Sequence, residues 1–424
     1  MKKYEVVVCG AGIVGIATAY YLTRKYGQKN LLLLDKLPPM TLTTSKSGEN
    51  FRDYWPQTCM TEFCSHSLDL MQELIETHGD VFKLRSSGYD FVSEKADREI
   101  FASAQAGTQI SSVSRTSDAT ALRRDYPWLS PQIRQVAHIN RAGAVDVYAL
   151  GTLMLNQARA AGTALAMGEV TGIEELPDSG YRLHVSAAAE SRVLETSSLV
   201  LAAGPFVNGL ARMLRIEVPV TSIRQHKFVI PDPQAVIPEN MPFTIFADSQ
   251  HLEWDDDERE LISEDPEYHW LLEEFPPGLH IKPEGSGHIK LGWAYNRKVE
   301  SPDWKAASDK HFPNIVMRGA SRFIPGLRQY RNSIPTPIAQ FSGYYTRTRE
   351  NWPLIGPLEK PGLFAAAALS GYGTMAACAA GELCADHMLG AATLPAYARN
   401  FHPERYHDQE IMAEISTLSS DGQL

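Results

Sequence analysis

The stretch "YEVVVCGAGIVGIATAYYLTRKYGQKNLLLLDK", residues 4–36, determines the fold class. Residues 6–8 form a continuous apolar run of the kind found in buried parallel strands, and the glycine loop at 10–15 follows directly. An apolar-periodic helix comes next, and a second apolar run, 31–34, ends at Asp35. This order of strand, glycine loop, helix, strand and acid predicts a dinucleotide-binding unit.

Each glycine of this loop has a separate physical role. Gly10 permits the tight turn, Gly12 lets the backbone approach a pyrophosphate, and Gly15 lets the helix pack on the strand. The helix N-terminus stabilises phosphate charge, and Asp35 would accept a hydrogen bond from a ribose hydroxyl. We therefore predict nucleotide contacts at Gly10, Gly12, Ile13, Val14, Gly15, Asp35 and Lys36.

Three further α/β signals indicate that the nucleotide-binding domain is discontinuous. They are a helix followed by a strand in "AVDVYALGTLMLNQARAAGTALAMGEV", an apolar strand with a Gly-Pro turn in "SSLVLAAGPFVNGLA", and the late segment "GLFAAAALSGYGTMAACAAGEL". We predict an α/β fold, α+β overall, whose Rossmann-like domain comprises residues 1–44, 146–214 and 346–424. Residues 45–145 and 215–345 would form a second, mixed-sheet domain.

Composition and charge exclude several classes of protein. The 424 residues are 44% hydrophobic, and no apolar run approaches the ~20 residues that span a bilayer. The N-terminus enters a strand at once, so we expect no signal peptide. The five cysteines have no CxxC spacing, which argues against a disulfide framework and a zinc site and favours a reducing, cytoplasmic location. We expect no bound metal.

The net charge of −10 is concentrated in one segment. Residues 253–274 contain eleven acids and Arg259 as the one basic residue, a difference of −10, so the remainder is nearly neutral. A nucleic-acid partner is therefore not expected, because it would require a basic face. We interpret the segment as an insertion, helical in "EYHWLLEEF" and otherwise an exposed loop. A solvated loop and a docking site for a basic protein partner both remain open.

The stretch "GSGHIKLGWAYN", residues 285–296, reads as a turn and a strand. Ile289, Leu291 and Trp293 would point one way, and Lys290 the other. A lysine in such a strand is most often solvated, so its role depends on what lies above it.

Taken in order along the chain, these motifs resemble the flavin amine oxidases of the D-amino-acid oxidase group, which includes glycine oxidase and sarcosine oxidase. The resemblance extends from "CGAGIVG" through "TTSKSGENFRD", "SSGYDFVS", "GAVDVYAL", "LVLAAGPFVNGLA", "GLHIKPEGSGHIKLGW", "YYTRTRENWPLIGP" and "ALSGYGTMAACAAGEL" to "FHPERY". It implies an FAD-binding domain roofed by the sheet of a substrate domain. It also implies oxidation of a C–N bond by hydride transfer to the flavin, hydrolysis of the imine, and reoxidation by oxygen that gives hydrogen peroxide.

The resemblance also implies which residues hold FAD. Beyond the first glycine loop, these are Thr44, Ser45, Ser47, Gly48, Val170, Ala203, Gly204, Gly371, Tyr372, Gly373 and Thr374. The cysteine that tethers FAD in sarcosine oxidases corresponds to Gly343, so non-covalent FAD is expected.

The resemblance implies only part of a catalytic site. Lys290 matches a lysine that lies over the flavin and promotes its reaction with oxygen. Tyr345 replaces a carboxylate-binding arginine of glycine oxidase, and Met375 replaces a carboxylate-binding lysine of sarcosine oxidase. A carboxylate substrate would then need another bidentate donor, for which we consider Arg52 and Arg347.

Three other functions remain open at this stage. The protein could be a dehydrogenase or complex subunit that passes electrons to a non-oxygen acceptor, a flavoprotein that acts on a protein partner, or an oxidase of hydroxy acids. The substrate, a small amine or amino acid in the first reading, is not disclosed by the sequence.

Overall fold

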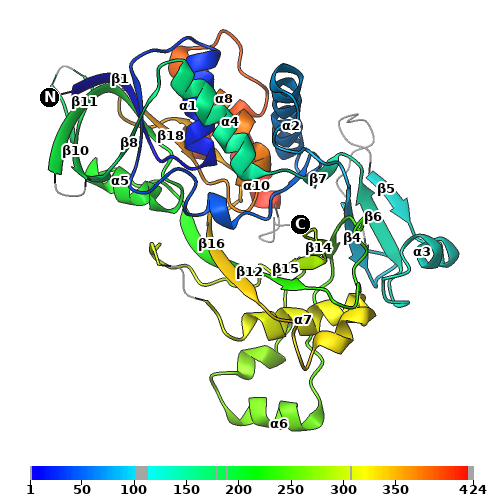
Figure 1. Cartoon of the computed structure of the whole chain (residues 1–424). Helices are drawn as coiled ribbons and strands as arrows, with labels where there is room; N and C mark the ends of the chain where they lie inside the picture. The colour runs from blue at the N-terminus through cyan, green and yellow to red at the C-terminus, as the bar shows by residue number, and fades with distance from the viewer. Residues whose placement is uncertain are drawn as a thin grey trace.

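Two large sheets organise the molecule, seen here in a computed structural model (Figure 1). The structure describes residues 2–98, 100–101, 113–177, 179–187, 190–305 and 308–418. The first sheet has the strand order β17-β18-β11-β1-β2-β8, with β10 and β9 continuing from β11. Its strands are β1 (Lys2–Cys9), β2 (Leu31–Asp35), β8 (Ala164–Met167), β9 (Glu169–Glu175), β10 (Tyr181–Ala187), β11 (Glu190–Leu201), β17 (Leu354–Pro357) and β18 (Leu363–Ala367).

Strand β1 lies at the centre of the parallel part of this sheet, between β11 and β2. Its residues alternate between two cores, as the pleat requires. Val6 and Val8 face α1 (Ile13–Arg24), α4 (Val147–Ala160) and α8 (Gly373–Leu389), whereas Val7 faces the hairpin β9-β10 and α5 (Val207–Met213). Both faces of the sheet are covered, so the successive residues Val6, Val7 and Val8 are all buried, and this explains the continuous apolar run at the start of the chain.

The second sheet has the order β16-β12-β15-β14-β13-β4-β6-β5. Helices α3 (Ala119–Asp125) and α7 (Phe312–Phe323) lie beside it, and α7 packs on its outer face (Figure 1). Its strands are β4 (Tyr89–Ser93), β5 (Val113–Thr116), β6 (Gln135–Ile139), β12 (Thr221–Pro231), β13 (Phe243–Phe246), β14 (Leu279–Pro283), β15 (His288–Gly292) and β16 (Ala339–Arg347). The predicted α/β class, with a discontinuous nucleotide-binding domain and a second mixed sheet, is confirmed.

Helix α2 (Thr58–His78) lies elsewhere than we expected. We expected it in the second domain, but its apolar face belongs to the core of the first, against α8 and the C-terminal helices α9 (Ala398–Phe401) and α10 (Gln409–Thr417). Phe63 contacts Tyr397 and Phe401 edge to face there. The two-stranded sheet of β3 (Asn50–Arg52) and β7 (Ala142–Ala144) lies near this junction. The remaining domain boundaries stay a prediction.

The acidic segment forms a projection below the second sheet (Figure 1). Its α-helix is α6 (Asp256–Glu264), not "EYHWLLEEF", where only a 3₁₀ turn forms at residues 269–272. The reason is local, because Asp255 and Glu258 form a capping box and Pro266 follows the helix end. Arg318 of α7 pairs with Glu258 and ties the projection to the sheet domain.

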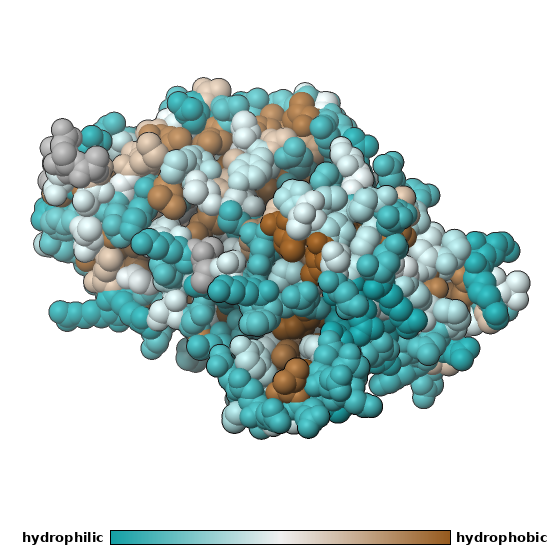
Figure 2. Space-filling model, turned by 60° about the horizontal axis from the view of Figure 1, so that its bottom comes forward, coloured by the Kyte–Doolittle hydropathy of each residue, from teal (hydrophilic) through white to brown (hydrophobic). Residues whose placement is uncertain are grey.

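Figure 2 shows this face of the molecule, where hydrophilic residues surround a small apolar patch on the projection. In the acidic segment, Leu261 of α6 is exposed, whereas the next residue, Ile262, is buried. A protein partner at this segment stays a prediction. Within the described residues, no helix is long and apolar enough to cross a membrane.

Candidate active site

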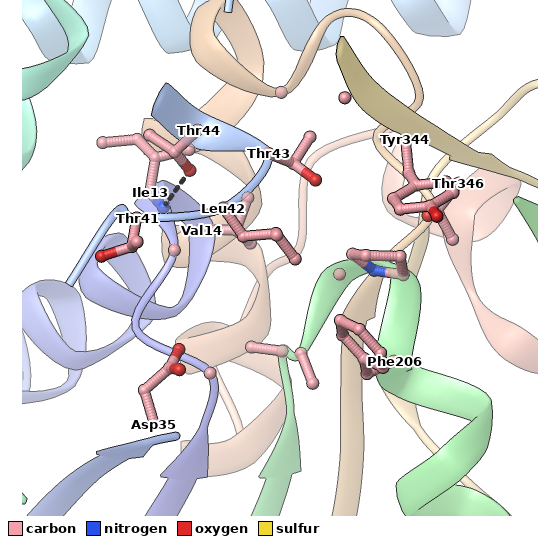
Figure 3. Close-up of a pocket in the computed structure, with 18 of the residues that line it drawn as sticks. Ile13, Val14, Asp35, Thr41, Leu42, Thr43, Thr44, Phe206, Tyr344 and Thr346 are labelled. Carbon is pink, nitrogen blue, oxygen red and sulfur yellow. Dashed lines mark hydrogen bonds between the residues drawn. The ribbon is translucent and has the colours of Figure 1, made fainter. Parts of the chain in front are cut away.

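A cavity of about 340 Å³ lies where the two sheets meet. The first sheet contributes its glycine loop and the ends of β2 and β11, and the second contributes β12 and β16. Figure 3 shows Asp35 at one end, the segment Thr41–Thr44 along one side, and Phe206, Tyr344 and Thr346 opposite. Of the predicted FAD-binding residues, those that line the cavity are Gly10, Gly12, Ile13, Val14, Asp35, Lys36, Thr44, Ser47, Val170, Ala203, Gly204, Gly371, Gly373 and Thr374.

The three glycines of the first loop differ in what surrounds them. A Cβ on Gly10, whose φ is +115°, would lie 2.3 Å from the carbonyl oxygen of Ala202. A Cβ on Gly15 would lie 1.9 Å from the carbonyl oxygen of Gly10, so this glycine packs the helix on the strand and lies outside the cavity lining. A Cβ on Gly12 would meet only Thr44 Oγ1, at 3.5 Å, and would project into the cavity.

Asp35 closes one end of the cavity. Its Oδ2 accepts from the backbone N–H of Ala11 at 2.6 Å, and its Oδ1 accepts from that of Leu37 at 2.9 Å. Burial raises the pKa of this carboxyl, although the backbone donors oppose the shift. An ionised carboxylate has about four acceptor sites, so Asp35 retains capacity for a ribose hydroxyl.

The segment after β2 covers the glycine loop. Thr44 Oγ1 accepts from the N–H of Ile13 at 3.1 Å, which fixes the segment over the start of α1 (Figure 3). Ser47 Oγ lies 2.7 Å from Thr374 Oγ1 and connects the segment to the start of α8. Ser45 lines a second, smaller cavity next to the first, and Gly48 lines neither.

The glycine loop before α8 forms the opposite end. A Cβ on Gly371 would lie 2.5 Å from the ring of Tyr345, so only glycine lets this roof tyrosine approach the loop. Tyr372 lies behind the cavity, where its hydroxyl donates to the carbonyl of Asn351 at 2.8 Å. Backbone N–H groups at the N-terminus of α8 are available to a partly negative ligand group.

The roof sheet presents a charged inner face. Ile289 and Leu291 point into the apolar core beside α7, as expected, and Lys290 points inward. Only 7% of the Lys290 side chain is exposed, and it is paired with Glu284, so it is not the solvated lysine of an ordinary strand. It lines the second cavity, not the first, and its position relative to the flavin stays a prediction.

Lys227, which the sequence analysis missed, lines the main cavity. It lies on β12 opposite Gly292 of β15 and Phe341 of β16. As at Lys290, the side chain that follows Lys227 points to the opposite face of its strand in "IRQHKFVIP". That next residue, Phe228, belongs to the apolar core beside α7. Phe206 and Trp304 were also missed; their rings stack at 4.0 Å beside Lys36.

The two candidate arginines differ sharply. Arg52 is buried, and burial lowers the pKa of its guanidinium to about 10. The guanidinium stacks 4.1 Å from the centre of the Trp55 ring, and its Nη1 is buried without a hydrogen-bond partner among the described residues. Arg347 is only half-buried, at the end of β16. Neither arginine lines either cavity.

The site is thus a long cavity with a dinucleotide-binding loop at one end and a cationic, aromatic roof at the other. Comparison with known proteins agrees. The family model "FAD dependent oxidoreductase", named DAO, matches residues 5–387. Human peroxisomal sarcosine oxidase is 26% identical over 226 residues, which are 52% of this chain and 55% of that enzyme.

Solved structures share the fold over nearly the whole chain. L-proline dehydrogenase from P. horikoshii has a TM-score of 0.73 at 19% identity and covers 96% of this chain and 98% of its own. L-α-glycerophosphate oxidase from Mycoplasma pneumoniae, solved with FAD bound, has a TM-score of 0.70 at 15% identity, with 95% and 99% covered. The chain belongs to the DAO family and is an FAD-dependent oxidoreductase.

The residues of the cavity fit FAD. The open space beside Gly12 admits a pyrophosphate to the backbone, and Asp35 offers an acceptor for a ribose. The hydroxyl of Thr43 lines the cavity and is buried without a hydrogen-bond partner among the described residues. This is expected of a group that forms a hydrogen bond with a bound polar ligand.

Replacing Gly12 by valine should abolish FAD binding without unfolding the protein. The backbone at Gly12, with φ −71° and ψ 175°, accepts any residue, but the side chain would fill the space that the pyrophosphate needs. Losing two charge-assisted hydrogen bonds of ~1.5–3 kcal/mol each corresponds to an affinity on the order of 100-fold lower or worse. Flavin absorbance retained after dialysis measures the loss. Gly172→Ala, outside the cavity, is the control, and a Gly12→Val protein that keeps its flavin would contradict the assignment.

Proposed function

We propose that the protein oxidises the C–N bond of a small amino acid or amine and passes the electrons to oxygen. A C–H bond next to nitrogen breaks, the nitrogen loses a proton, and water hydrolyses the resulting imine to a carbonyl compound and an amine. FAD, when bound, accepts the hydride from that carbon. The observation that carries the substrate class is the buried guanidinium of Arg52, whose Nη1 has no hydrogen-bond partner among the described residues.

A buried cation without a counter-charge is costly and usually serves a ligand. Arg52 forms no ion pair with a described residue, and the next residue, Asp53, interacts with Arg141 and Asp69 instead. The titratable groups that act on Arg52 are Tyr89, Cys64 and Tyr54. Burial raises the pKa of each of them, so none supplies a negative charge at pH 7. A planar donor fork in this setting suits a carboxylate, which supports an amino acid over a simple amine.

Aromatic residues connect Arg52 to the main cavity. Its guanidinium lies 5.2 Å from the ring centre of Phe91, on the inner face of the roof. Tyr89 lies near both Arg52 and Tyr345, since each contributes to its pKa, and a Cβ on Gly371 would lie 2.5 Å from the Tyr345 ring. We propose that the substrate lies along this aromatic wall, with its carboxylate at Arg52 and its reacting carbon toward the cavity.

The roof would also select the protonation state of the substrate. Lys227, Lys282 and Lys290 point to one side of the sheet. Lys227 forms no ion pair with a described residue, so its charge would repel a protonated amine. The neutral amine, which is the form that releases a hydride, is not repelled. The reaction then depends on alignment more than on a dedicated general base.

Anaerobic mixing tests the reaction class. The holoenzyme should lose its flavin absorbance when mixed with at least one member of a panel of amino acids and N-methyl amino acids. If no member of a broad panel reduces the flavin, the proposed substrate class is wrong.

The electron acceptor needs a separate measurement. An oxidase should release one hydrogen peroxide per substrate oxidised in air. A yield near zero, with rapid turnover when a quinone or dye is added, would favour a dehydrogenase, the alternative that a similar fold in a proline dehydrogenase keeps open.

A further inference from the structure

Lys227 is a half-buried lysine that lines the main cavity. It lies on β12 at the roof end, away from Asp35, and its Nζ is 5.8 Å from the ring centre of Tyr345. A Cβ on Gly48 would lie 3.7 Å from the same Nζ, so the loop after β2 closes over it. Because Tyr345 contacts Gly371 at the start of α8, Lys227 lies at the end of the cavity opposite the ribose site.

The other two lysines of this face have acidic partners. Lys290 pairs with Glu284 and lies 3.8 Å from Glu49, and Lys282 lies 3.3 Å from Glu284. Lys227 forms no ion pair with a described residue. Among these three lysines, Lys227 is therefore the one whose charge no described acidic residue compensates.

The neighbours of Lys227 come from every adjacent element. Lys282 and His280 lie on β14, Lys290 on β15 and Tyr345 on β16, while Lys46 of the loop lines the same cavity. Burial, and then repulsion by Lys290 and Lys282, lowers the pKa of Lys227 to about 7. The nearby His280 is kept neutral, since burial and Lys227 lower its pKa to about 3. Lys227 is thus charged below about pH 7 and neutral above it.

We propose that Lys227 is the cation that sets the electrostatic potential at the ring end of FAD, and hence its reduction potential. Reduction of FAD by two electrons and one proton adds one negative charge to the ring system. A cation at that end stabilises the added charge, whereas the charge of Lys290 is offset by Glu284. The inference rests on the FAD binding in the proposed function but not on the substrate.

The test is the reduction potential of the bound flavin, measured against a reference dye between pH 6 and 9 without substrate. Lys227→Met should make two-electron reduction at pH 6 about 10- to 100-fold less favourable, which is about 30–60 mV. Lys290→Met, the matched variant, should shift the potential less. The wild-type potential should fall more steeply through pH 7 than that of Lys227→Met, because only the wild type loses a positive charge there.

Lys227→Arg separates charge from structure. Arginine stays charged at pH 9, so its flavin potential should exceed the wild-type potential there and match it at pH 6. Equal potentials in wild type, Lys227→Met and Lys227→Arg at every pH would overturn the inference, as would a larger shift in Lys290→Met. If Lys227→Met loses its flavin, the comparison of the flavin potentials of Lys227→Arg and the wild type still tests the inference. A protein that shows the predicted potentials but oxidises no amine would refute the proposed function alone.

Discussion

Replacing Arg52 by methionine should lower kcat/KM for the amino-acid substrate on the order of 10²–10³-fold while leaving the protein at least as stable. Truncating one partner of a buried charge pair costs ~2–5 kcal/mol of binding. The free protein loses a buried charge that forms no ion pair with a described residue, which relieves a desolvation cost, and methionine can still pack against the rings of Trp55 and Phe91. Steady-state kinetics and a thermal melt of the same preparation measure both effects.

Two comparisons make this prediction specific. Arg347→Met should change kcat/KM little, because that side chain is only half-buried at the end of β16, where solvent screens its charge. Arg52→Lys should recover only part of the loss, since an ammonium cannot bind a carboxylate in a bidentate manner. If Arg52→Met left kcat/KM unchanged, or if Arg347→Met caused the larger loss, the carboxylate site would lie elsewhere.

The largest loss of stability should come from Arg405→Met. The Arg405 side chain is fully buried in the C-terminal segment, where its Nε donates to Glu350 at 2.8 Å and its Nη2 also contacts that carboxylate. Removing the arginine leaves Glu350 buried and uncompensated, which costs about 3–5 kcal/mol. Chemical unfolding should report this decrease in the free energy of unfolding.

The control for this prediction is Arg399→Met, in the same C-terminal region. Arg399 is exposed and pairs with Asp408 and Glu410, so solvent screens the interaction and little change is expected. The double variant Glu350→Gln/Arg405→Met should recover part of the lost stability, because it removes the orphaned charge. A single variant Arg405→Met as stable as wild type would contradict the importance of this pair.

The first glycine loop could be predicted from sequence because its physics is local. The spacing of Gly10, Gly12 and Gly15 encodes a turn, an approach path and a packing contact within six residues. Asp35 follows from the same unit, since a parallel strand delivers it to the edge where the cavity opens. Alternation likewise sufficed to place Lys290 on the inner face of its strand.

Other features of the site could not be predicted, because they depend on residues that are distant in sequence. Lys227 faces the cavity because β12 pairs with both β15 and β16, a register that no single strand discloses. Lys290 pairs with Glu284, which lies in the turn between β14 and β15, whereas Lys227 pairs with no described acidic residue, and sequence alone does not disclose this difference. The acidic helix was misplaced because the capping box at Asp255 outweighed the apolar pattern of "EYHWLLEEF".

Amino-acid oxidation is the central claim, and one anaerobic comparison tests it most directly. The holoenzyme is mixed with three compounds that share a skeleton: an amino acid that reduces the flavin, the amine without its carboxylate, and the hydroxy acid without its nitrogen. We predict rapid flavin reduction by the amino acid, reduction at least 100-fold slower by the amine, and none by the hydroxy acid. Faster reduction by the hydroxy acid than by the amino acid would contradict the account.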